Sequence, residues 1–319
     1  MKVLLLGHKG WIGQKVIKIL DNQNIDYVTT DYRGETDVLK QFILDNNITH
    51  IYCCLGRTHG TLNNKIYTTI DYLENKETLH ENINDNLYVP LSLAMFSDKH
   101  NIHFTYIGTG CIFSDNEKQF TELDKPNFFG SNYSIVKGFT DMLMKNTNAL
   151  ILRIRMPISS DKSIRNFITK ITTYEKICSI PNSMTILDEL LPISVEMMKN
   201  QETGCFNFTN PGVISHNEIL EMYKEIVPPS ELTWINYGAG DEKREIESIL
   251  YKEQTTNDNR TGVWSKCYST AKYNAWADLH DIMNWNHNNP HNLIHTYRIR
   301  FYHPDKKYKE SWIKDKEQK

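Results

Sequence analysis

The chain has 319 residues and a composition typical of a globular protein. Hydrophobic residues make up 39% and charged residues 24%, which excludes a collagen-like, low-complexity or wholly disordered chain. Lys and Arg number 36 and Asp and Glu 39, so the net charge is −3, too balanced for a protein that coats nucleic acid or an anionic membrane. No segment approaches the ~20 apolar residues of a membrane span, and we expect a soluble, cytoplasmic protein.

Strand and helix patterns alternate over the first half of the chain. Apolar runs that predict strands lie at residues 2–6, 27–31, 50–55, 103–108 and 149–155. Helical spacing separates them, at residues 11–20, 38–44, 86–99 and 133–145. This order predicts an α/β fold of the Rossmann type, a doubly wound parallel sheet covered by helices on both faces.

A glycine-rich turn joins the first strand to the first helix, with the GxxGxxG spacing over residues 7–13. The first two glycines permit a tight turn and close approach of the backbone to a pyrophosphate, and the third lets the helix pack near the strand. The helix N-terminus supplies amide donors. We therefore expect a nicotinamide dinucleotide, held by Gly7, Lys9, Gly10, Trp11, Ile12 and Gly13.

The end of the second strand bears on the choice of cofactor. Asp31 could accept a ribose 2′-hydroxyl, whereas Arg33 could pair with a 2′-phosphate. Lys9 adds a second cation, which favours NADPH, and NADH stays open. Two further expected cofactor contacts are Gly56, after the third strand, and Asn86, at the start of the helix predicted at residues 86–99.

Tyr133 and Lys137 form a YxxxK pattern on a predicted helix, so the phenol and the ammonium lie one turn apart on one face. A nearby cation would lower the pKa of Tyr133 and make it a usable acid or base near neutral pH. The same lysine could hold a nicotinamide ribose. Thr109 ends the fourth strand, where a hydroxyl is expected to help polarise a carbonyl.

Taken in order, the glycine turn, Asn86, Thr109, Tyr133 and Lys137 resemble the extended short-chain dehydrogenase/reductase family. Longer runs narrow the resemblance to the plant-type bifunctional UDP-4-keto-6-deoxyglucose 3,5-epimerase/4-reductases of UDP-rhamnose synthesis. These runs are residues 109–113, 126–128, 152–161, 165–172, 180–192 and 207–212. The resemblance extends from Met1 to about Val227 and is weaker across residues 37–82.

The resemblance implies that one site inverts C3 and C5 of a 4-keto sugar and then reduces C4 with NADPH, giving UDP-β-L-rhamnose. Cys111, two residues beyond Thr109 and on the same side if the strand continues, is the expected base. Lys170 would return protons from the opposite face. Thr109 and Tyr133 would stabilise the C4 oxyanion, and Tyr133 would donate the last proton. The expected substrate-binding residues are Asn166, Asn182, Ser183 and Thr185. For the last three, capping and loop hydrogen bonds are the alternative role.

We expect two parts in the chain. Residues 1–155 form an NADP-binding Rossmann domain, with a late strand near residues 205–208 returning to its sheet. Residues 156–319 form mainly a smaller C-terminal substrate-binding lobe, with a charged tail at 305–319. From about Ser230 the chain departs from the family. The histidines that crowd this region are interpreted as solvated or core residues, and no metal site is expected: His280, His287, His291, His295 and His303.

Two other functions stay open. A plain NDP-4-keto-6-deoxy-sugar reductase, similar to dTDP-4-dehydrorhamnose reductase, would need neither Cys111 nor Lys170. A catalytically silent NADP-binding regulatory subunit would not need the intact set of Thr109, Tyr133 and Lys137. The expected partners are a UDP-linked nucleotide sugar and a second copy in a homodimer, with a 4,6-dehydratase as the upstream pathway neighbour and no nucleic acid or membrane.

Overall fold

The computed structural model describes residues 1–32, 36–114, 119–174 and 181–226. It also gives the backbone of three short strands, β12 (Lys266–Cys267), β13 (Ala275–Trp276) and β14 (Arg300–Phe301). Within these ranges no helix is long and apolar enough to cross a membrane.

A six-stranded parallel sheet forms the centre of the fold, in the order β11-β8-β6-β3-β1-β2. Its strands are β1 (Val3–Leu6), β2 (Tyr27–Thr29), β3 (His50–Cys53), β6 (His103–Thr109), β8 (Leu150–Ile154) and β11 (Gly204–Asn207). The strand order reverses between β1 and β3. In open α/β sheets the carboxyl ends of the strands at such a reversal form the ligand crevice.

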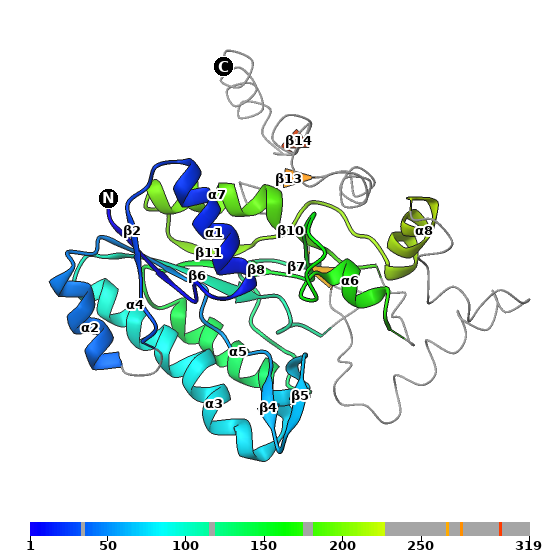
Figure 1. The fold of residues 1–319 in the computed structure, drawn as a ribbon, viewed down its shortest axis with the longest axis horizontal. Helices are drawn as coiled ribbons and strands as arrows, with labels where there is room; N and C mark the ends of the chain where they lie inside the picture. The colour runs from blue at the N-terminus through cyan, green and yellow to red at the C-terminus, as the bar shows by residue number, and fades with distance from the viewer. Residues whose placement is uncertain are drawn as a thin grey trace, which may run out of the picture.

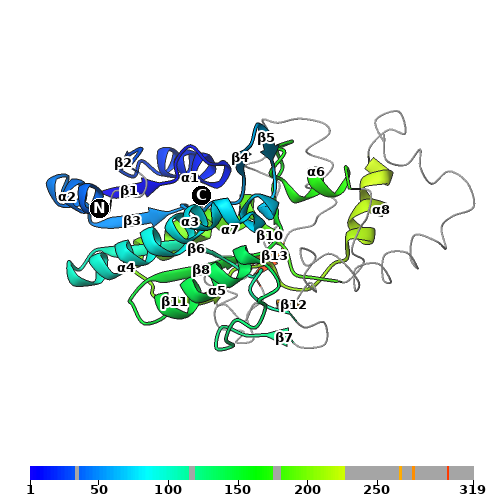
Figure 2. The same ribbon diagram turned by 90° about the horizontal axis from the view of Figure 1, so that it is seen from below.

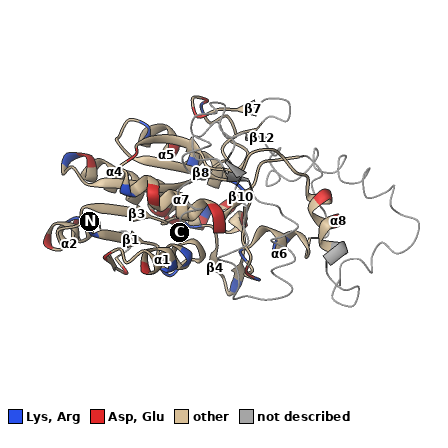
Figure 3. Cartoon of the chain, turned by 90° about the horizontal axis from the view of Figure 1, so that it is seen from above, with Lys and Arg blue, Asp and Glu red and all other residues tan. Residues whose placement is uncertain are grey.

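Helices cover both faces of this sheet (Figure 1). Leu5 and its neighbours on one face pack against α1 (Trp11–Asn22) and α7 (Leu187–Lys199). Leu4 and Leu6, which point the other way along the strand, pack against the second layer of helices, α2 (Thr36–Asp45), α4 (Val89–Lys99) and α5 (Asn132–Met144). Figure 3 shows the charged residues mainly on the helices and loops, while β1 and β3 carry none.

A second group of elements lies beyond the carboxyl ends of the strands (Figure 2). It contains β9 (Pro157–Ile158), α6 (Phe167–Ile171), β10 (Thr185–Ile186) and α8 (His216–Ile226). These elements share a small core of their own, formed by residues such as Ile158, Phe167 and Ile186. β7 (Gln119–Phe120) pairs with β12.

The segment between β3 and α4 holds structure that the sequence pattern did not predict. It forms the hairpin β4 (Gly60–Leu62) and β5 (Lys65–Tyr67), then η1 (Ile70–Glu74), η2 (Lys76–Thr78), α3 (Leu79–Ile83) and the π-helical turn η3 (Asn84–Tyr88). Tyr72 and Leu73 of this segment pack against Tyr133 of α5. The excursion therefore forms one wall beside the predicted site.

The predicted fold class is confirmed, with local differences in length. The second strand ends at Thr29 rather than at residue 31, and the helix expected at 86–99 begins as the π-helical turn η3 before continuing as α4. β11 lies beside β8 in the main sheet. The division of the chain at residue 155 into two functional parts stays a prediction.

Candidate active site

The glycine turn after β1 has the shape that a pyrophosphate needs. Gly7 has φ 76°, and a Cβ there would lie 2.8 Å from the carbonyl of Cys54. A Cβ at Gly13 would lie 2.2 Å from the oxygen of Gly7, so neither position accepts a side chain. α1 begins without a side-chain cap and with no acidic residue in its first turn. Its amide groups can therefore receive an anion, and the turn fits a dinucleotide.

The exposed groups beside this turn pair with each other. Lys9 Nζ lies 2.7 Å from Asp31 Oδ1, and His8 Nε2 lies 3.6 Å from the same oxygen. The hydrogen bond from Lys9 lowers the pKa of Asp31. Arg33 lies outside the described residues, so the preference for NADPH over NADH stays a prediction.

Gly56 and Asn86 form a buried contact next to the turn. Asn86 Oδ1 accepts from the Arg57 amide at 3.0 Å, and Nδ2 donates to the Arg57 carbonyl at 3.0 Å and to Asn82 Oδ1 at 2.9 Å. A Cβ at Gly56 would lie 3.2 Å from Asn86 Oδ1. Asn86 thus fixes the loop that follows β3, and its side-chain hydrogen bonds are made within the protein.

Tyr133 lies in the first turn of α5, which two neighbours hold in place. Ser131 caps the helix by accepting from the Ser134 amide at 3.1 Å, and Glu74 accepts from the Asn132 amide at 3.0 Å. The Thr109 side chain lies near enough to the Tyr133 hydroxyl to affect its pKa. Burial raises the pKa of Tyr133, although Thr109 and Arg155 act in the opposite direction. The phenol therefore stays protonated.

The contacts of Lys137 differ from those that the sequence predicted. Its ammonium donates to the hydroxyl of Tyr106 on β6 and lies 4.5 Å from the centre of that ring. Burial lowers the pKa of Lys137 to about 8. The prediction that Lys137 lowers the pKa of Tyr133 is wrong, because the lysine contacts a different tyrosine and burial dominates at Tyr133.

Cys111 reaches the site by a turn and not by continuation of the strand. β6 ends at Thr109, and the Cys111 amide donates to Thr109 Oγ1 at 3.1 Å. The strand therefore does not continue to Cys111, and the condition for placing both side chains on one side of it is not met. The turn nevertheless packs Cys111 against the cluster around Tyr133. Its Sγ accepts a hydrogen bond from Arg155 Nη1 at 2.8 Å.

Lys170 lies on α6, whose start is fixed by Asn166. Asn166 Oδ1 accepts from the Ile168 amide at 3.2 Å, and Nδ2 donates to the carbonyls of Ser159 and Asp161 at 2.5 and 2.6 Å. Lys170 is half-buried. Burial and Arg165 lower the pKa of Lys170, and the charge of Cys111 opposes this. Lys170 and Cys111 thus interact electrostatically across the site.

The four predicted substrate-binding residues fall into two groups. Thr185 donates to the Phe208 carbonyl and accepts from the Arg155 amide, both at 2.8 Å, and Asn166 caps α6. Thr185 thus makes loop hydrogen bonds and Asn166 a helix cap, and a role of either in substrate binding stays a prediction. Asn182 Nδ2 and Ser183 Oγ are buried and lack a hydrogen-bond partner in the described part of the chain. Buried polar groups are rarely left unpaired, so these two atoms are candidates for ligand contacts.

Three arrangements near the site were not predicted. Arg155 joins Cys111 to Asn182. Arg153 forms a buried ion pair with Asp141 of α5, at 2.6 and 2.8 Å, which ties the helix carrying Tyr133 to β8. The third joins α1, the loop after β9 and the start of α7. Asp161 of that loop and Asp188 of α7 accept from Trp11 and Lys15 of α1 and from Ser159 of the loop. In the sequence, the alternation of basic and apolar residues over 149–155 was the pattern that could have singled out Arg153 and Arg155.

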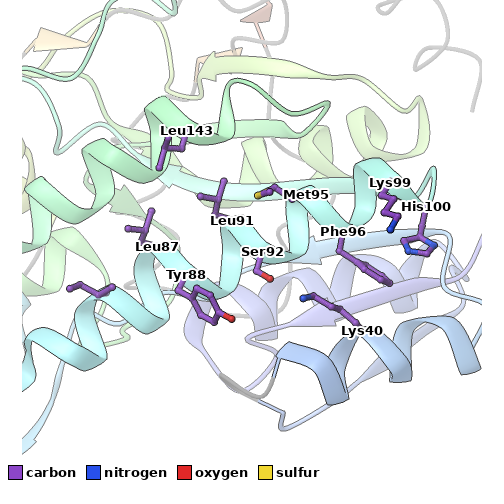
Figure 4. Close-up of a pocket in the computed structure, with 11 residues that line it drawn as sticks. Lys40, Leu87, Tyr88, Leu91, Ser92, Met95, Phe96, Lys99, His100 and Leu143 are labelled. Atoms are coloured by element: carbon purple, nitrogen blue, oxygen red, sulfur yellow. The ribbon is translucent and has the colours of Figure 1, made fainter.

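A hollow of about 720 Å³ lies elsewhere, over the outer side of α4 (Figure 4). Its walls carry none of the predicted site residues. They are formed by Lys40, Ile83, Leu87, Tyr88, Leu91, Ser92, Met95, Phe96, Lys99, His100 and Leu143. The histidines at residues 280–303 lie outside the described residues.

Comparisons with known proteins show which proteins the chain resembles in sequence and fold. The chain is 49% identical over 267 residues to protein L780 of Acanthamoeba polyphaga mimivirus, covering 81% of this chain and 89% of that protein. The crystal structure of the L780 UDP-rhamnose synthase matches with a TM-score of 0.68 at 51% identity, covering 71% of this chain and 80% of that chain. A bifunctional dTDP-4-dehydrorhamnose 3,5-epimerase/dTDP-4-dehydrorhamnose reductase of Arabidopsis thaliana is 42% identical over 255 residues, 76% of this chain and 81% of that protein.

The fold is also that of a dTDP-4-dehydrorhamnose reductase from Bacillus anthracis, solved in complex with NADP, with a TM-score of 0.58 at 16% identity over 69% of this chain and 78% of that chain. The model of the RmlD substrate binding domain matches residues 1–177. Because this match spans more than half of the chain, and relatives above 40% identity cover three quarters of it, the chain belongs to the RmlD substrate binding domain family.

Proposed function

We propose that this protein is a bifunctional nucleotide-sugar epimerase/reductase that converts UDP-4-keto-6-deoxy-D-glucose to UDP-β-L-rhamnose with NADPH. The proposal rests on one observation: groups suited to proton transfer and groups suited to polarising a carbonyl lie in the same part of the structure. Cys111, whose charge acts on the pKa of Lys170, packs in the same cluster as Tyr133, whose pKa Thr109 lowers. Cys111 and Lys170 can transfer protons at carbon, and Tyr133 and Thr109 can polarise a carbonyl.

The epimerisation uses the acidity that a ketone gives to its neighbouring carbons. Cys111, as thiolate, removes the proton from C3. The C–H bond breaks, an S–H bond forms, and the electron pair moves to the C4 oxygen. The hydroxyls of Thr109 and Tyr133 donate to that oxygen and stabilise its negative charge. Lys170 then delivers a proton to the opposite face of the carbon, and the electron pair returns from oxygen to form the new C–H bond. Cys111 releases its proton to solvent and Lys170 takes one up, and the same sequence repeats at C5.

The reduction follows, because loss of the ketone removes the acidity that epimerisation needs. Bound NADPH supplies the hydride that C4 receives. Tyr133 donates its phenolic proton to the C4 oxygen, a role suited to a group that burial keeps protonated. The residues that would hold the cofactor are the glycine turn, the first amides of α1 and the Lys9–Asp31 pair.

The direct test incubates the protein with UDP-4-keto-6-deoxyglucose and NADPH in D₂O and identifies the product by NMR. Wild type should give UDP-β-L-rhamnose with deuterium at C3 and C5. Cys111→Ser and Lys170→Ala should lose the exchange yet still reduce an already epimerised ketone. Cys205→Ser and Lys199→Ala are matched controls, because Cys205 lies on β11 and Lys199 pairs with Glu196 at the end of α7.

Two results would replace the proposal. If both Cys111 and Lys170 variants exchange deuterium like wild type, the protein is a plain 4-keto-sugar reductase. If folded wild-type protein binds NADPH but neither exchanges deuterium nor oxidises NADPH, it is a silent regulatory subunit. A homodimer and an upstream 4,6-dehydratase stay predictions.

A further inference from the structure

A buried arginine lies directly beside the sulfur of Cys111. Arg155 follows β8 and is 2% exposed. Its Nη1 donates to Cys111 Sγ at 2.8 Å, and its Nε donates to Asn182 Oδ1 at 3.2 Å. Because the two bonds use different nitrogen atoms of one planar group, they fix both the position and the plane of the guanidinium.

The backbone of Arg155 is held equally firmly. Its amide donates to Thr185 Oγ1 and its carbonyl accepts from the Thr185 amide, both at 2.8 Å. The next residue, Met156, has φ 40°, in the left-handed region that a side chain of this size seldom adopts. Such strain persists only where the surroundings over-determine the backbone, and it concentrates at functional sites. The two bonds to Thr185 provide that constraint.

The chemistry of a guanidinium limits what Arg155 can do. It stays charged at any working pH, so it neither gives nor takes a proton. It can pair with a thiolate and direct its lone pair. When Cys111 takes a proton from C3 or C5, the negative charge leaves the sulfur for the C4 oxygen while Arg155 keeps its own charge.

The charge of Cys111 also affects the pKa values of Lys137 and Lys170, but these two lysines are placed differently from Arg155. Lys137 donates to the Tyr106 hydroxyl. Lys170 lies on α6, in the other group of elements, and is the predicted acid of the opposite face. The hydrogen bond to the sulfur comes from Arg155.

We propose that Arg155 is the positioning residue of the epimerase base: it pairs with the Cys111 thiolate and directs it at the substrate, while Asn182 fixes the plane of the guanidinium. This inference rests on the proposed function, in which Cys111 is the base. It predicts that Arg155 matters for proton transfer at carbon and little for hydride transfer to C4.

The first experiment measures the thiol without any turnover. The rate of Cys111 alkylation by iodoacetamide is measured at pH 7, with Cys111→Ser as the baseline for the other cysteines. Arg155→Met should lower this rate about tenfold, because the sulfur loses the cation that donates a hydrogen bond to it. Arg165→Met is the matched control, since Arg165 is half-buried near Lys170 but donates to the Thr68 carbonyl. Alkylation of Arg155→Met like wild type would overturn the inference.

The second experiment separates positioning from a structural role. Deuterium exchange at C3 and C5 should fall at least about tenfold in Arg155→Met, while NADPH oxidation with an already epimerised ketone stays within about threefold. Should Arg155→Met fail to fold, Arg155→Lys keeps a cation but cannot keep both hydrogen bonds. It should still alkylate and bind NADPH, and exchange slowly. Equal loss of exchange and reduction, or wild-type exchange in Arg155→Lys, would contradict the positioning role.

The two proposals fail in different ways. If Cys111→Ser exchanges deuterium like wild type, the assignment of Cys111 as base fails, whatever Arg155 does to alkylation. If Cys111→Ser stops exchange but Arg155→Met alters neither alkylation nor exchange, only the role of Arg155 fails.

Discussion

Glu189 should make the protein less stable as the pH rises through the neutral range. This residue of α7 is 5% exposed; its Oε2 accepts from Asn210 Nδ2 at 2.8 Å, and its Oε1 has no partner in the described ranges. Burial raises the pKa of Glu189 from 4.5 to about 7, and Asp188 adds to the effect. Between these two pH values the folded state binds more protons than the unfolded state, so stability falls as the pH rises.

The size of the effect follows from the difference between the pKa of Glu189 in the folded and the unfolded chain. A tenfold change in proton affinity corresponds to about 1.4 kcal/mol, so the loss between pH 4.5 and pH 7 amounts to up to about 3 kcal/mol. Glu189→Gln keeps an oxygen for Asn210 and removes the ionisation. The variant should match wild type near pH 5 and exceed it in free energy of unfolding at pH 8.

Urea denaturation of both proteins between pH 5 and pH 8 measures this difference directly. Other titrating groups, such as the buried histidines, are common to both proteins and cancel when the two curves are subtracted. Glu196→Gln is the control, because Glu196 lies on the same helix and pairs with exposed Lys199. A stability difference between wild type and Glu189→Gln that is the same at pH 5 and pH 8 would refute the reasoning.

Three further predictions concern the proton donor of the reduction, the preference for NADPH over NADH, and the stability of the fold at low pH. Tyr133→Phe should lower NADPH oxidation by ~10² or more while NADPH binding persists, since only the proton donor is lost; unchanged turnover would contradict its role. Arg33→Ala should weaken the binding of NADPH more than that of NADH by up to ~3 kcal/mol; titration of both cofactors measures this, and equal effects would exclude an Arg33 contact with the 2′-phosphate. Burial lowers the pKa of His50 from 6.5 to about 4, so stability should fall as the pH drops through that window, and His50→Gln should flatten the fall in urea titrations.

Local sequence patterns predicted the parts of the site whose residues lie within a few positions of one another along the chain. The glycine turn is such a case, because Gly7 and Gly13 are required by contacts with their own neighbours in sequence and with the residues that follow β3. The helix carrying Tyr133 is another, since its apolar spacing and its Ser131 cap are both local. Such features depend on backbone geometry that a few residues determine.

Contacts between distant segments could not be predicted in the same way. Arg155 reaches Cys111 over 44 positions, and Trp11 reaches Asp161 over 150. Lys137 has the expected place on its helix, yet its ammonium contacts Tyr106, 31 positions away. The periodicity of a helix gives the face on which a side chain lies, but the partner on that face depends on which strand the sheet brings there.

The environment of Tyr133 also explains how one site can hold a base and an acid together. A negative charge on Cys111 raises the pKa of Tyr133, in the same direction as burial. In the proposed mechanism, the phenol is therefore held in its protonated form while Cys111 acts as the thiolate base. It would then donate to the C4 oxygen during both inversions without giving up its proton. In the same proposal Arg155, which donates to Cys111 Sγ, pairs with the thiolate, so the two groups would keep different protonation states until reduction creates an alkoxide basic enough to take the phenolic proton.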